Sequence, residues 1–178
     1  MERLAPVLVF LGLSLPAAAS ASDHDTIVFD VVYGATVSKY SFGTKWQPTL
    51  WIDGSYGVAG PLHLGAYFQW LGEKFPLDNP GFGGGGLIAL RRNIKKVRLT
   101  GAFGGGYLGV PVPVLSIPDA PYRHEGSGTI TAFAGLGYGF IDFLGIEFRG
   151  RWARYFRMPA GTPDSAWSIE AGLTFFIE

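Results

Sequence analysis

The chain has no cysteine, and its formal net charge at neutral pH is zero, with 14 basic and 14 acidic residues. The first absence excludes disulfide bonds, thiolate metal ligands and a lipid-modified N-terminal cysteine. The second argues against a nucleic acid as partner, because neutralising backbone phosphates requires a basic surplus. Only 16% of the 178 residues are charged and 48% are hydrophobic, which excludes a disordered chain and suffices for one folded domain.

The first 21 residues predict a secretory signal peptide. Arg3 precedes an apolar run, Leu4 to Leu15, which Pro16 ends, and the small residues Ala19-Ser20-Ala21 form a cleavage site. The run is shorter than the ~20 apolar residues that a membrane-spanning helix needs. We therefore expect removal of residues 1–21 and export of a single domain, residues 22–178, into the cell envelope of a Gram-negative bacterium.

The rest of the sequence repeats one pattern, in which apolar residues alternate with polar or small ones. In the last segment Trp167, Ile169 and Leu173 fall on one face, while Glu170 and Thr174 fall on the other. A period of two is typical of β-strands whose two faces meet different surroundings. The pattern predicts eight strands, at residues 26–39, 49–58, 62–71, 83–90, 97–107, 129–140, 144–152 and 165–178.

The connections between these strands alternate between long and short. Long loops are expected at residues 38–48, 72–82, 111–127 and 154–164, and short turns at 59–61, 91–96 and 142–143. An even number of strands joined in this rhythm, with both chain ends on the short-turn side, is the organisation of an outer-membrane barrel. We therefore predict an all-β fold, an eight-stranded antiparallel up-and-down transmembrane β-barrel with periplasmic turns and longer external loops.

The polar face decides whether such a barrel is turned toward lipid or toward water, because alternation alone fits both. Every lysine lies in a loop, a turn or at a strand end, and the polar face instead carries glycines such as Gly34, Gly135 and Gly172. Small residues suit a crowded lumen, so we expect the apolar rows to face lipid. Aromatic residues should then mark the two membrane surfaces. Those expected are Phe29, Tyr56, Tyr138, Phe140 and Phe175 at the periplasmic rim and Trp70, Tyr107, Trp152 and Trp167 at the outer rim.

The C-terminal segment EAGLTFFI resembles the assembly signal of outer-membrane β-barrel proteins. Its polar residue Glu170 is followed by Gly172 and by the large apolar residues Phe175 and Ile177. This segment and the strand pattern of the whole mature chain together resemble the eight-stranded outer-membrane barrels of the OmpA-like, OmpX-like and OmpW-like group. The resemblance implies a location in the outer membrane, contact with its lipid and lipopolysaccharide, and insertion by the barrel-assembly machinery; we expect a monomer.

The predicted lumen carries ionisable residues of both signs. Those on inward faces are Asp30, Asp53, Glu147 and Glu170 among the acids and Arg98, Arg149 and Arg151 among the bases. Residues on facing strands share a face, so Glu170 should pair with Arg149 or Arg151. An eight-stranded barrel is just wide enough for side chains to fill. We expect these residues to form a network that plugs the lumen; the alternative is a gate or narrow polar pathway built from the same residues.

Enzyme chemistry has few candidate residues. A nucleophile and base outside the lumen could come from His124, Glu125 and Ser127 in one loop and Asp164 and Ser165 in the next, but no strand carries a histidine and serine two apart. Glycines at 81, 83 and 86 match G-x-G-x-x-G, yet no helix follows, so they predict no dinucleotide site. The sequence has no H-E-x-x-H motif and no histidine cluster for a metal. We expect no catalytic, cofactor or metal site.

The sequence is compatible with three functions. The first is a structural or surface-interaction protein, adhering through its external loops or contacting lipopolysaccharide through Arg123, Arg154 and Arg157. The second is a narrow, porin-like channel or a transporter of small apolar molecules, with a lateral opening near the glycine-rich strands. The third is an outer-membrane enzyme that modifies lipid A.

Overall fold

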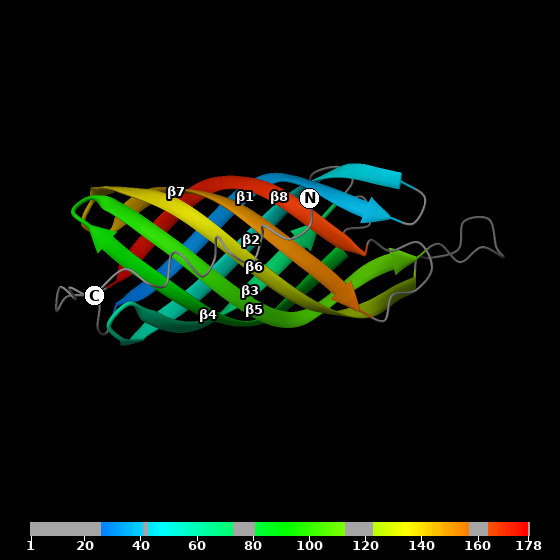
Figure 1. The fold of residues 1–178 in the computed structure, drawn as a ribbon, viewed down its shortest axis with the longest axis horizontal. Helices are drawn as coiled ribbons and strands as arrows, with labels where there is room; N and C mark the ends of the chain where they lie inside the picture. The colour runs from blue at the N-terminus through cyan, green and yellow to red at the C-terminus, as the bar shows by residue number, and fades with distance from the viewer. Residues whose placement is uncertain (1–25, 41–42, 73–80, 113–122, 157–163, 178) are drawn as a thin grey trace, which may run out of the picture.

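A closed antiparallel barrel of eight strands makes up the computed structural model, which describes residues 26–40, 43–72, 81–112, 123–156 and 164–177 (Figure 1). The strands are β1 (Ile27–Tyr40), β2 (Gly43–Ala59), β3 (Leu62–Leu71), β4 (Gly81–Ile94), β5 (Val97–Val112), β6 (Arg123–Ile141), β7 (Leu144–Phe156) and β8 (Ser165–Ile177). Each strand pairs with its neighbour in the chain, and β8 pairs with β1 to close the ring. The predicted fold class is confirmed, whereas the predicted signal peptide lies outside the described residues.

The strand register sets the width of the barrel. Partners followed once around the ring from Ile27 lead back to Val37, ten residues further along β1. The path runs through Tyr56, Leu64, Ile88, Phe103, Ala132, Trp152 and Trp167. With a rise of ~3.3 Å per residue and ~4.8 Å between strands, this shear gives a strand tilt of about 40° and a backbone radius of about 8 Å. Such a lumen has room for side chains but not for an open channel beside them.

Side chains alternate between the two faces of the wall along every strand. In β7, Glu147, Arg149 and Arg151 are buried inside the barrel, and Phe148 between them is 57% exposed. Ile169, between Ser168 and Glu170 in β8, is 79% exposed. The apolar rows therefore point outward, as predicted.

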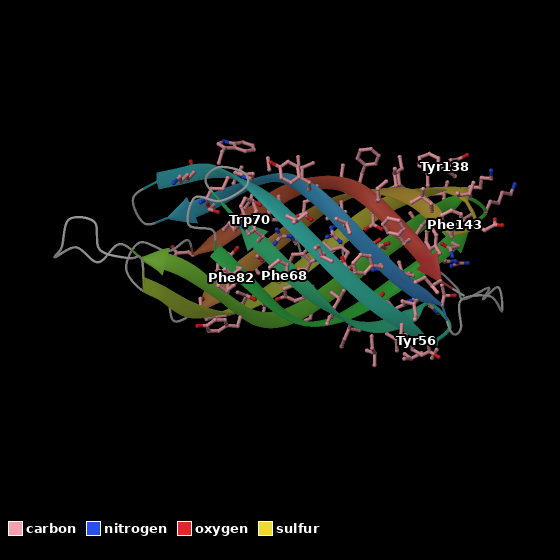
Figure 2. The ribbon with its side chains drawn as sticks, turned by 180° about the vertical axis from the view of Figure 1, so that it is seen from behind. Tyr56, Phe68, Trp70, Phe82, Tyr138 and Phe143 are labelled. Atoms are coloured by element: carbon pink, nitrogen blue, oxygen red, sulfur yellow. The ribbon has the colours of Figure 1, made fainter. Side chains whose placement is uncertain are left out.

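Exposed aromatic side chains include a group at each end of the barrel. Figure 2 shows Tyr56, Tyr138 and Phe143 near the end formed by the short turns, and Trp70 and Phe82 toward the opposite end. Trp152 and its cross-strand partner Trp167 lie toward the same end as Trp70 and Phe82. Tyr56, Tyr138, Trp70, Trp152 and Trp167 thus lie toward the ends that the sequence predicted for them, and Phe143 and Phe82 add to the two groups.

Several strands are longer than predicted. The expected loop 38–48 is mostly strand, because β1 runs to Tyr40 and β2 begins at Gly43. Turn-forming residues suggested a loop there, but Pro48 lies beyond the last β3 partner of β2. Its carbonyl accepts from the Gly72 N–H at 3.2 Å, and its missing N–H falls outside the β2–β3 ladder. Likewise β4 continues past Leu90 to Ile94, so the turn expected at residues 91–96 consists only of Lys95 and Lys96. Lys95 has a positive φ of 57°, the left-handed conformation of a tight turn.

Two inward glycines bring β8 and β1 close together at the seam of the barrel. A Cβ atom on Gly34 would overlap the carbonyl oxygen of Ile169, and one on Gly172 would overlap that of Val31. No larger residue fits at these two positions without moving a backbone. The glycine-rich inner face therefore permits the tight closure of the ring.

Candidate functional site

The lumen contains a buried cluster of arginines and carboxylates, and its first part joins β4 to β1 and β2. Arg91 contacts Asp30 (Nη1 to Oδ2, 2.7 Å) and Asp53 (Nη2 to Oδ1, 2.8 Å). The two aspartates are direct cross-strand partners, so their like charges face each other. The arginine between them offsets that repulsion, because a guanidinium presents two donors in a fixed fork.

The second part of the cluster centres on Glu170 of β8. Arg149, its cross-strand partner, donates from Nε to Oε2 at 2.8 Å, and Arg151 donates from Nε to Oε1 at 2.7 Å. The Ser168 hydroxyl adds a third bond at 2.7 Å. Glu170 therefore pairs with both candidate arginines, one carboxylate oxygen to each, where the sequence predicted one partner or the other.

Arg149 links the two parts into one network. Its Nη1 donates to Asp53 Oδ2 at 2.8 Å while its Nε holds Glu170. All of these side chains are almost fully excluded from solvent. Buried ion pairs keep their charges only when the remaining lone pairs are also bonded, and here each oxygen of Asp53 and of Glu170 accepts from an arginine.

An aromatic plug lies against the arginines. Trp51 stacks on Tyr67, with ring centroids 4.1 Å apart and planes 11° apart, and meets the edge of Phe133 at 6.3 Å. The guanidinium carbon of Arg149 lies 4.5 Å from the Phe133 ring centroid, and that of Arg151 lies 4.6 Å from the Trp51 ring. Cation–π contacts gain strength where water is excluded. Ions and rings together fill this level of the lumen.

Two further hydrogen bonds fix the plug. The Trp51 indole N–H donates to Asp53 Oδ2 at 2.9 Å, which ties the ring to the ion network. The Tyr67 and Thr129 hydroxyls lie 3.1 Å apart and are hydrogen bonded. Since Thr129 belongs to β6 and Tyr67 to β3, this bond reaches across the lumen.

Two of the predicted lumen residues lie near the edge of this network. Glu147 is fully buried, with Oε2 at 4.0 Å from Arg91 Nη1 and 3.4 Å from the Thr100 hydroxyl, which donates to it. Arg98 lies at the short-turn end, where its Nε donates to Asn93 Oδ1 at 3.1 Å. Arg98 was expected beside the lumen acids because alternation gives the face of a residue but not its depth in the barrel.

Arg91 and the aromatic plug were not predicted from the sequence. Arg91 was expected in a turn, although Leu87 and Ala89 share its inward phase and a longer strand places it in the lumen. The alternation along their strands puts Trp51 and Phe133 on the inward face, but nothing local in the sequence indicates that they meet, because they belong to β2 and β6.

The residues of the predicted assembly signal lie along β8. Glu170 and Gly172 line the lumen, Phe175 packs beside Phe29 with ring centroids 6.3 Å apart, and Ile177 is exposed and pairs with Ile27 of β1. These positions describe the folded barrel; recognition by an assembly machine is a separate property.

Of the residues considered for catalysis, the structure describes the side chains of Ser127, Asp164 and Ser165. The Ser127 hydroxyl donates to the Phe156 carbonyl at 2.7 Å, Ser165 is half-buried and Asp164 is exposed. The side chains of His124 and Glu125 lie outside the described part of the chain. Within that part, no group of three or more histidine, cysteine or acidic side chains could hold a metal ion. Nor do the described residues include a helix long and apolar enough to cross a membrane.

Comparison with known proteins bears on the fold. No protein-family model and no curated protein sequence matches the chain. The solved structures similar to it include Neisserial surface protein A (12% identity, TM-score 0.64), covering 84% of this chain and 96% of that one. The N-terminal β-barrel domain of Pseudomonas aeruginosa OprF has 10% identity and a TM-score of 0.63, covering 86% of this chain and 98% of the domain. Ail, the attachment invasion locus protein of Yersinia pestis, has 14% identity and a TM-score of 0.54, covering 85% and 99%. The chain therefore has the fold of the eight-stranded outer-membrane β-barrels.

Proposed function

We propose that this chain is an integral outer-membrane protein with a closed lumen and a role that is structural or that depends on contacts made by its surface. The filled lumen is the observation that carries this proposal. Trp51, Arg151 and Glu170 are each at most 1% exposed, and they lie at one level of a barrel with a radius of about 8 Å. The proposal includes no catalytic activity.

Planar-bilayer recording tests the closed lumen. The folded chain, checked in the same sample by its heat-modifiable migration on a gel, should give no stable conductance steps. The Glu170→Ala variant separates a structural network from a gate, because it removes the shared acceptor of Arg149 and Arg151. Steps in the unmodified protein would refute the closed lumen, and steps gained only on substitution would show that the network acts as a gate.

The outer rim supports lipopolysaccharide as a surface partner. Arg154 and Lys39 are both exposed and both pair with Ser165, so the two cations flank one position of β8. Trp152 and Trp167 lie two residues further into the barrel wall on the same outward face. Cations beside indole rings suit a phosphorylated glycolipid, because the cations bind its phosphate groups and the indole rings contact its apolar part. The side chain of Arg123, and residue 157, lie outside the described part.

The amount of lipopolysaccharide that copurifies with the folded protein tests this contact. The double variant Lys39→Gln/Arg154→Gln should retain less than the unmodified chain. Arg92→Gln, at the opposite end of the barrel, is the matched control and should retain the same amount. Equal retention by all three proteins would exclude lipopolysaccharide binding through Arg154 and Lys39.

A bare stretch of wall favours a second candidate function, the passage of small apolar molecules into lipid. Residues 84–86 of β4 and 104–106 of β5 are all glycine, and Gly85 pairs with Gly106 and Gly86 with Gly105. Neither face of this patch carries side chains, so only backbone bonds and neighbouring strands hold it. Uptake of small apolar solutes by proteoliposomes distinguishes the candidates, because a structural barrel should give no uptake above protein-free vesicles.

A further inference from the structure

A cavity of about 240 Å³ lies at the end of the barrel formed by the short turns. The β4–β5 turn, the β6–β7 turn and the end of β8 contribute to its lining, which includes Lys95, Lys96, Arg98, Asp142 and Phe176. A single buried water needs roughly 10–15 Å³ on this kind of measure, so the cavity has room for a group of several heavy atoms.

The arginine in this cavity is fixed in place before any ligand binds. Arg98 is only 6% exposed, and its guanidinium carbon lies 3.7 Å from the centroid of the Phe176 ring. Its Nε donates to Asn93 Oδ1 at 3.1 Å. A stacked and hydrogen-bonded guanidinium has a defined plane, so little side-chain freedom remains to be lost on binding.

The two lysines belong to a turn that the barrel holds rigidly. Lys95 takes the left-handed backbone conformation, with φ of 57°, and the Lys96 carbonyl accepts a 2.8 Å hydrogen bond from the N–H of Gly139 in β6. The turn is thereby tied to β6, the strand that pairs with β5. The buried Thr174 side chain lines the same cavity.

The charges lining the cavity are unbalanced. Lys95, Lys96 and Arg98 carry three positive charges, against one negative charge on Asp142. A guanidinium fork beside two ammonium groups matches the geometry and charge of a phosphate. We propose that this short-turn mouth of the barrel binds a phosphate group, carried by an anionic phospholipid headgroup or by a free phosphate monoester. This site goes beyond the proposed function, because it uses neither the filled lumen nor the outer rim.

Native mass spectrometry of the folded full-length mature chain in a neutral detergent tests the site. The protein is offered phosphatidylglycerol and phosphatidylcholine of equal chain length, and isothermal titration calorimetry with sn-glycerol 3-phosphate forms a second arm. The Lys95→Gln/Lys96→Gln double variant alters exposed turn residues, and heat-modifiable migration verifies that it has folded. Arg92→Gln is the matched control, since Arg92 lies on the same hairpin but not in the cavity lining.

The unmodified protein should retain phosphatidylglycerol over phosphatidylcholine by about tenfold, the factor that two solvent-exposed ion pairs can provide. The lysine double variant should lose this preference and the Arg92→Gln variant should keep it. Heat of binding with glycerol 3-phosphate would assign the site to phosphate monoesters, and binding of the lipid alone would assign it to a headgroup. Equal retention of the two lipids with no heat from glycerol 3-phosphate, or equal loss in the Arg92→Gln control, would overturn the proposal.

Discussion

Replacing Glu170 by glutamine should destabilise the barrel by about 3 kcal/mol. The substitution keeps the shape of the side chain and removes the charge that accepts from Arg149 and Arg151. A hydrogen bond to a charged group contributes ~1.5–3 kcal/mol, and removing one partner of a buried ion pair costs ~3–5 kcal/mol. Arg149 keeps its 2.8 Å contact with Asp53, so the lower part of that range applies. Arg151 is affected more, because its other side-chain hydrogen bond among the described residues is to Thr49 at 3.4 Å.

Urea unfolding in phospholipid vesicles, followed by tryptophan fluorescence and by gel migration, measures this loss. With an m-value of ~1–3 kcal/mol/M the midpoint should fall by about 1–3 M. Asp142→Asn changes an exposed carboxylate and should stay within about 0.5 kcal/mol of the unmodified protein. Adding Arg151→Met to Glu170→Gln removes the unpaired cation and should restore part of the stability. A Glu170→Gln protein as stable as the unmodified one would refute the reasoning, because the arginines would then not depend on this carboxylate.

Three other substitutions test the remaining structural claims. Trp51→Ala removes the centre of the aromatic plug and should lower the free energy of unfolding by ~3–5 kcal/mol in the same urea assay; a change below 1 kcal/mol would mean that the ring is not packed. Gly172→Ala places a methyl group on a neighbouring backbone and should slow or prevent folding into vesicles, measured by gel migration, while Gly150→Ala, which meets open space, should not. Ile169→Arg puts a cation on the outward face and should cost ~2–4 kcal/mol if that face lies in hydrocarbon, against ~0–1 kcal/mol for Ile94→Arg near the rim; equal costs would contradict the membrane orientation.

The fold and half of the ion network could be predicted because a period of two fixes the face of every residue in a strand. Glu170 and Arg149 lie on the inward faces of neighbouring strands. Their pairing could therefore be predicted from the alternation of side chains together with a strand register known to within one or two residues. Burial of Asp30 and Asp53 follows from the same parity. Nothing beyond the alternation of side chains was needed for these assignments.

The rest depends on quantities that local periodicity does not contain. Arg91 was missed because the basic run 91–96 was expected to form a turn, although the inward phase of Leu87 and Ala89 continues to Arg91. The meeting of Trp51 with Phe133 depends on the shear of the ring, which sets the height of β6 relative to β2 and is known only when every register is known. Arg98 lies at the short-turn mouth because it is the second residue of β5, directly after the β4–β5 turn.

The ionic cluster links strands that lie on both sides of the seam between β8 and β1. Arg149 of β7 holds Glu170 of β8 on one side of the seam and Asp53 of β2 on the other side. Opening the ring between β8 and β1 would separate Arg149 from Asp53 and leave each of these charges with one partner fewer. The network therefore acts as an internal cross-link that disfavours opening of the ring.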